Sequence, residues 1–379
     1  MKRLFTYAGM ILLLFLLSAV SVSADEVYEF ELNEADEKAE GIFEEFLESI
    51  PEDIKKELPD SEYDTAFEEY DQEYYFEKIK ESIKEAVGPS VKVVALLLGI
   101  VILSAVFNVF ASNISGDKLK GVFSFCSSLC VALSIFYAMK TVFDTVKILL
   151  DTLSKTMLAL IPAMETVYIQ SGNLTSAAVT STGINIMIGF TESLFSKIIE
   201  PCIYVAFILA VVGAVTKNSG IAFMVKSLRG LLTGGIIVVM TVMSFVLALQ
   251  SSAAGAADTF TVKTLKFAIG NYLPIVGGTV AESFSLLSGS MGVIKQSCGT
   301  IGIAVMVVAF LPPFAVILMN RVAIGISAAF AEVLGCEREG ALIGECKSIC
   351  TLLLAVSAGG AVMYIIALGI FCKTPLAVN

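Results

Sequence analysis

The chain contains no histidine and no tryptophan among its 379 residues. The absence of histidine excludes Ser–His and Cys–His nucleophile pairs, imidazole metal ligands and the commonest general base near neutral pH. The sequence also has no Walker motif, no dinucleotide-binding glycine fingerprint and no pair of carboxylates at catalytic spacing. We therefore expect no enzymatic activity, no catalytic residue, no cofactor and no nucleic-acid partner.

The eight cysteines do not pair by spacing into a zinc motif. Cys346 and Cys350 stand one helical turn apart, which is at most half of a metal site. Other cysteines lie in or at the ends of apolar runs, where cysteine packs as a small hydrophobic side chain: Cys126, Cys130, Cys202, Cys298 and Cys372. We therefore expect no metal site.

Long apolar runs dominate the remaining sequence. Hydrophobic residues make up 56% of the chain, and the mean hydropathy is +0.83. Several uncharged stretches reach the roughly 20 residues that span a bilayer as a helix. The composition predicts an all-α polytopic membrane protein.

Charge divides the chain into two regions. Residues 25–86 hold 24 acidic residues and 6 lysines, whereas residues 87–379 hold 12 acidic and 17 basic residues. The overall net charge of −11 therefore hides a strongly acidic N-terminal region and a mildly basic remainder. Such a division indicates two different surroundings.

The N-terminus has the three parts of a secretory signal peptide. Lys2 and Arg3 precede an apolar core, and small residues ending at Ala24 follow it. We predict a cleavable signal peptide at 1–24; an uncleaved signal anchor is the alternative. Either one places the acidic region, 25–88, outside the cytoplasm.

The acidic region has helical periodicity. Apolar residues from Ile42 to Ile50 recur at helical spacing, and an aromatic stripe extends from Tyr63 to Tyr74. The pattern predicts two or three amphipathic helices. They either rest on the protein's own membrane domain or form a docking surface for an extracytoplasmic partner.

The membrane domain, 89–379, is predicted to contain about six full spans. Gly88-Pro89 is expected to end a helix before the first of them. The spans are 91–111, 121–139, 201–216, 230–250, 298–320 and 349–371. This number places the C-terminus outside the cytoplasm.

Basic residues precede three of these spans. The positive-inside rule places such clusters in the cytoplasm, so we interpret them as topology anchors rather than as an electrostatic binding site. The anchors are Lys118, Lys120, Lys226, Arg229 and Lys347.

Landmarks recur at an almost constant offset. Gly121 and Gly230, Pro162 and Pro274, and Pro201 and Pro312 are separated by 109, 112 and 111 residues. This spacing predicts a parallel internal repeat over 113–224 and 222–334, with 349–371 as a final span.

Each repeat contains a segment broken by proline and glycine, at 162–185 and 274–294. Irregular backbone at membrane depth requires cover by protein or water, so the segments are either re-entrant or surface hairpins. The predicted helix breaks are Pro162, Pro201, Pro274, Gly277 and Gly278. Ionisable and polar residues in apolar surroundings form a candidate polar seam: Glu165, Asn173, Glu192, Glu282 and Lys295. The acids do not align between the two repeats.

Two phrases, "LIPAMETVYIQSG" and "NYLPIVGGTVAESFSLLSGSMGVIK", are distinctive. Together with the signal peptide and the acidic region, they make the chain resemble the stage III sporulation protein AE family of endospore-forming Firmicutes. The resemblance implies a permease-like component of the channel apparatus that joins mother cell and forespore. It implies the mother-cell membrane around the forespore as location and other membrane proteins of the stage III complex as partners.

Three functions fit this resemblance and these segments. The first is an integral membrane component of the channel or secretion-like apparatus. The second is a structural scaffold that assembles other members without conducting. The third is a small-solute transporter. Contact with the lipid bilayer is common to all three, and a homo-oligomer is left open.

The anchors make the topology testable. Single cysteines at Asn113, Asn218 and Glu345, in a background without native cysteines, should resist an impermeant thiol reagent added from outside. The reason is that each precedes or lies within a basic cluster that the positive-inside rule keeps in the cytoplasm. Labelling of any of the three in intact cells would contradict the parallel orientation.

Overall fold

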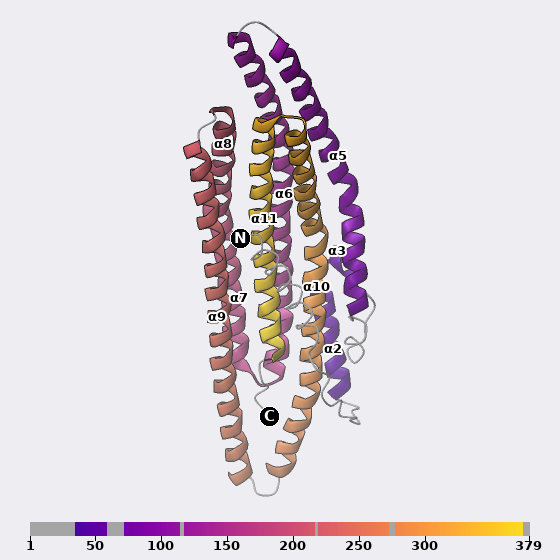
Figure 1. Cartoon of the computed structure of the whole chain (residues 1–379). Helices are drawn as coiled ribbons and strands as arrows, with labels where there is room; N and C mark the ends of the chain where they lie inside the picture. Colours follow the sequence, from indigo (N-terminus) through magenta and orange to yellow (C-terminus); the bar gives the residue numbers. More distant parts are fainter. Residues whose placement is uncertain (1–34, 59–71, 114–116, 217–218, 273–276, 374–379) are drawn as a thin grey trace.

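The computed structural model describes residues 35–58, 72–113, 117–216, 219–272 and 277–373, and every regular element in these ranges is a helix (Figure 1). Two short helices come first, α2 (Ala35–Ser49) and α3 (Glu52–Lys55). The long ones are α5 (Gln72–Asn113), α6 (Asp117–Gln170), α7 (Leu174–Leu194), η1 (Phe195–Ile199), α8 (Glu200–Thr216), α9 (Ser219–Tyr272), α10 (Gly277–Val333) and α11 (Glu337–Lys373). The predicted signal peptide and Pro274 lie outside the described residues.

Within the described ranges, six helical stretches are long and apolar enough to cross a membrane, and α7, η1 and α8 together form one of them. This confirms the all-α polytopic fold class. The candidate stretches are 36 to 46 residues long, about 54–69 Å at 1.5 Å per residue. The hydrocarbon core is only about 30 Å thick, so the helices extend well beyond it.

The long helices run alternately up and down, and α10 and α11 lie at the centre (Figure 1). In their most apolar stretches, 67% of the residues of α10 and 61% of those of α11 are buried in the protein, against 11% for α9. The predicted span 298–320 is therefore helical, but its first half is enclosed by other helices rather than by lipid.

α6 is one helix of 54 residues that contains the predicted span 121–139 and continues to Gln170. Its second half has one fully buried face: Phe143, Val146, Leu150, Leu153, Met157 and Leu160. Asp144, Lys147, Asp151 and Lys155 are exposed on the opposite side. Apolar residues at three- and four-residue spacing thus form a helix face that packs into the core of the bundle.

Two prolines do not end helices, so the predictions for Pro162 and for Gly88-Pro89 are wrong. Pro162 lies inside α6 and Pro89 inside α5, and both are exposed. A proline removes one main-chain hydrogen bond and crowds the preceding turn. Because both rings face outward, the buried side of each helix keeps its packing, and this packing outweighs the local penalty.

Pro201 does not break its helix either; it follows a π-helical turn, η1. The N–H of Glu200 bonds to the carbonyl of Phe195, five residues earlier, so the helix widens directly before the proline ring. The helix then continues as α8. The predicted break at Pro201 is therefore a local change of helical pitch.

The predicted broken segments have ordinary helical geometry where they are described. Segment 162–185 comprises the end of α6, a turn at 171–173 and the first half of α7. Gly277 and Gly278 are the first residues of α10, which continues without interruption through 279–294. α6 and α9 are both 54 residues long and each leads into another long helical stretch, but the internal repeat itself stays a prediction.

Helix α2 rests on the protein's own helices, as the first interpretation of the acidic region proposed. Ile42, Phe43, Phe46 and Ile50 are buried in the same core as α6 and α10. The Phe46 ring lies beside Gly302 of α10. The N-terminal acidic region is thus joined to the membrane domain through a shared apolar core.

The burial of Phe46 predicts a large effect on stability. Phe46→Ala should lower the free energy of unfolding by about 3 kcal/mol, because it leaves a cavity between α2 and α10. Phe76→Ala removes the same atoms from a side chain that is 71% exposed and should change it by less than about 0.5 kcal/mol. Thermal unfolding in detergent compares the two; equal melting temperatures would contradict this packing.

Candidate functional site

A polar cluster surrounds Tyr168 near the end of α6. The Lys295 ammonium nitrogen, from α10, lies 5.0 Å from the centre of the Tyr168 ring and 5.6 Å from that of Phe371 in α11. The two rings meet edge to face with centroids 5.1 Å apart. Lys295 is only 2% exposed, so the aromatic faces contribute cation–π attraction to a cation withdrawn from water.

The turn beside this cluster has a defined hydrogen-bond pattern. Gly172 has a φ of 76°, its N–H bonds to the carbonyl of Ile169, and the N–H of Asn173 bonds to that of Tyr168 at 2.8 Å. This is a Schellman motif, in which a left-handed glycine satisfies the last carbonyls of a helix. Gly335, with a φ of 72°, ends α10 in the same way. The α6–α7 turn therefore holds Tyr168 and Asn173 in fixed positions.

The N-terminus of α7 is capped by another helix. Asp258 of α9 accepts hydrogen bonds from the N–H groups of Thr175 (2.8 Å) and Ser176 (2.6 Å). Asn173, at the N-cap position, makes no capping bond with its side chain. Asp258 is 3% exposed, and its carboxylate meets both the free N–H groups and the positive end of the helix dipole.

Only some residues of the candidate polar seam lie close together. Glu165, half-buried, stands one turn before Tyr168, so Glu165, Asn173 and Lys295 lie around the same end of the bundle. Glu192 is exposed on α7, about 28 Å along the helix from Asn173. Glu282 belongs to α10, but its side chain lies outside the described part of the structure.

The predicted topology anchors lie near the N-terminal ends of α6, α9 and α11, which begin toward the same end of the bundle, with α6 extending beyond the other two (Figure 1). Arg229 also forms an ion pair with Glu345 of α11 at 2.8 Å. The Lys347 stem lies against Gly325 of α10, and Lys226 is exposed. Arg229 and Lys347 thus have packing roles between helices in addition to the one predicted.

A buried carboxylate joins three helices at the same end. Glu339 of α11, 3% exposed, accepts hydrogen bonds from Ser104 of α5 at 2.9 Å and from Ser127 of α6 at 3.0 Å. The two hydroxyls also contact each other. Sequence reasoning missed this cluster, because two serines among apolar residues and a glutamate at a helix start give no signal of contact.

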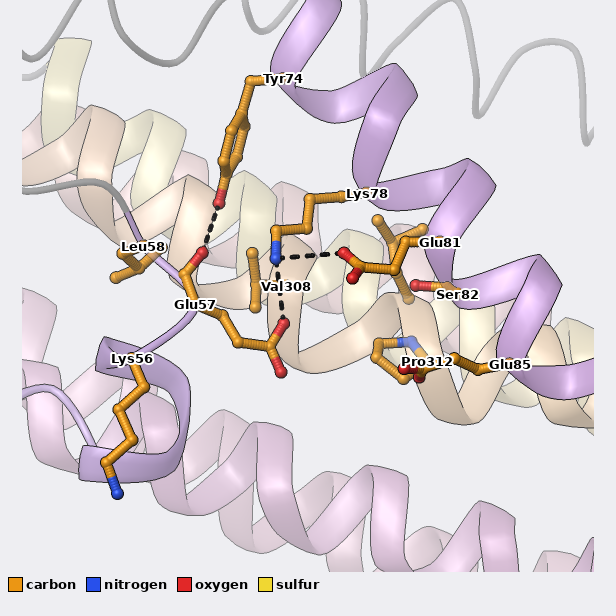
Figure 2. Close-up of a pocket in the computed structure, with 11 residues that line it drawn as sticks. Lys56, Glu57, Leu58, Tyr74, Lys78, Glu81, Ser82, Glu85, Val308 and Pro312 are labelled. Atoms are coloured by element: carbon orange, nitrogen blue, oxygen red, sulfur yellow. Dashed lines mark hydrogen bonds and ion pairs between the residues drawn. The ribbon is translucent and has the colours of Figure 1, made fainter.

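A groove opens where the turn after α3, the first turns of α5 and the middle of α10 meet (Figure 2). Its volume is about 390 Å³. It is lined by Lys56, Glu57, Leu58, Tyr74, Lys78, Glu81, Ser82, Glu85, Val308, Leu311 and Pro312. Lys78 bridges Glu57 at 3.3 Å and Glu81 at 3.5 Å, and the Tyr74 hydroxyl donates to the Glu57 carbonyl. We call this site the α3–α5–α10 groove.

Comparison with known proteins gives one family match. A family model described as stage III sporulation protein AE matches residues 60–374. The chain belongs to this family.

The family match covers all six long helical stretches but not α2 and α3. Stage III sporulation protein AE of Bacillus subtilis (strain 168) is 25% identical over 186 residues, which cover 49% of this chain and 47% of the relative. That alignment therefore spans about half the length of the relative. No solved structure matches the chain.

The capping of α7 by Asp258 yields a second prediction on stability. Asp258→Ala should lower the free energy of unfolding by about 1–2 kcal/mol, because two N–H groups lose their acceptor. Hydrogen exchange at Thr175 and Ser176 should accelerate before that of neighbouring helices. Asp151→Ala, which removes an exposed i, i+4 pair with Lys155, should leave both measurements almost unchanged; equal effects would refute the cap.

Proposed function

We propose that this protein is a structural membrane subunit of the channel apparatus that joins mother cell and forespore, and that it acts by assembling other members. Membership of the stage III sporulation protein AE family supports the process. Six helices of membrane-spanning length support a multi-pass location, for which we propose the mother-cell membrane around the forespore. In this proposal residues 25–88 and the C-terminus are extracytoplasmic, and the protein has no catalytic role.

The observation that carries the scaffold role is the packing along the axis. The central positions are occupied by α10 and α11, and their apolar stretches are mostly buried against α5, α6 and α2. Such a core favours a structural role over the conduction of a solute, because close-packed side chains leave no room for a hydrated path. The long extramembrane parts of the helices supply surface for partners.

Conduction is the second candidate, and the observation that favours it is Lys295. An ionisable residue buried in a membrane-spanning helix commonly marks a substrate or ion path. Glu165 and Asn173 lie at the same end of the bundle, and the π-turn η1 resembles the irregularities found at functional sites. Under this alternative the cluster around Tyr168 belongs to a polar path between copies or partners.

The two candidates predict different effects of one substitution. If the protein assembles without conducting, Lys295→Met should leave spore yield within about twofold of normal, because a methionine of similar length packs against the same rings. The full-length tagged protein and the variant should then co-purify equal amounts of other membrane proteins of the complex.

A variant with normal protein level and normal co-purification, but with spore yield reduced a hundredfold or more, would instead support conduction. Absence of co-purified complex members with the unmodified protein, after mild solubilisation of sporulating cells, would contradict the proposed function itself. Phe76→Ala, on an exposed residue of α5, is the control for the effect of mutagenesis on yield.

A further inference from the structure

The α3–α5–α10 groove combines an apolar floor with an acidic rim. Val308, Leu311 and Pro312 of α10 form the floor, and Glu57, Glu81 and Glu85 stand around it (Figure 2). Its volume of about 390 Å³ is enough for an extended side chain together with ordered water. The shape suits a ligand with an aliphatic stem and a charged end.

The charge of the rim favours a cation. Lys78 lies between Glu57 and Glu81 and partly neutralises both. Glu85 forms no ion pair with any described residue, and Lys56 points away from the other charged groups in Figure 2. One carboxylate is thus uncompensated within a region whose sequence is strongly acidic, and such a field attracts cationic groups.

The Ser82 hydroxyl and the main chain beside Pro312 add polar groups to the groove. Ser82 is 6% exposed, its hydroxyl turns toward the groove in Figure 2, and it bonds to no described residue. Pro312 has no N–H, so the carbonyl of Val308 lacks its usual helical donor. A ligand that donates several hydrogen bonds would supply a donor to each of these two groups.

We propose that this groove binds a basic side chain, lysine or arginine, presented by another protein of the complex. The methylene stem lies on Val308, Leu311 and Pro312, and the charged end reaches Glu85 and the Ser82 hydroxyl. This inference rests on the proposed function, which places the partner on the extracytoplasmic side of the membrane. It assigns the assembly role to one defined site.

A metal ion fits these residues less well. Within the described ranges, no group of three or more acidic or cysteine side chains is placed to hold one. The apolar floor would add nothing to metal binding, whereas it buries the stem of a lysine or arginine. The groove therefore selects an amphipathic cation over a bare one.

The test uses the full-length protein in nanodiscs of phosphatidylcholine, with a fluorescent hexalysine peptide as the probe. The double substitution Glu81→Gln/Glu85→Gln should weaken peptide binding at least tenfold. Glu44→Gln/Glu45→Gln makes the same charge change at exposed positions on α2 and should weaken it less than twofold. Ser82→Leu, which fills the groove, should match the first variant at an unchanged melting temperature.

Three outcomes would overturn the proposal. The first is an equal loss of affinity in the groove variant and the α2 control, which would indicate only the general acidic field. The second is binding of free spermine or Ca²⁺ as tight as that of hexalysine, with the same dependence on Glu81 and Glu85. The third is no measurable peptide binding. Because the assay contains no other member of the complex, its failure is separate from a failure of the co-purification test.

Discussion

The packing of α10 against α11 is the contact on which the rest of the structure depends. Most of the other helices pack on this pair: α5 and α2 lie on α10, α9 and α8 lie on α11, and α6 contacts both, whereas α7 packs mainly on α6 and α9. Because hydrocarbon supplies no hydrophobic drive between helices within a bilayer, such packing relies on close fit and a few polar bonds. Small residues such as Gly302 and Gly360 allow that close fit.

Polar side chains inside the bundle form hydrogen bonds between helices. Asp258 joins α9 to α7, Glu339 joins α11 to α5 and α6, and Ser154 bonds to Tyr364 at 3.0 Å. Each such bond adds modest stability, but leaving either partner alone in a dry interior costs more. They therefore fix the register of long helices that apolar contacts alone would allow to slide.

The sequence allowed the helical class and the positions of the six apolar runs to be predicted, because spanning length and periodicity are local properties. The prediction that proline ends a helix was wrong at Pro89 and Pro162. Both rings face outward, and the orientation of a side chain relative to a bundle is not visible in a single sequence. Lys295 was recognised because a charge in an apolar run stands out. Asp258 was not, since its partners Thr175 and Ser176 are far away in the chain and the carboxylate caps a helix that it does not belong to.

The continuity of α5 through Pro89 has a mechanical consequence. This one helix begins at the α3–α5–α10 groove, part-way along the bundle, and ends at one tip of the bundle (Figure 1). Its 42 residues form a rod about 63 Å long, and a tilt of about 5° at one end displaces the other by about 5 Å. A rod of this kind acts as a lever. A displacement of its first turns by a partner bound at the acidic region therefore moves the last turns of α5 without a change in the structure of the helix.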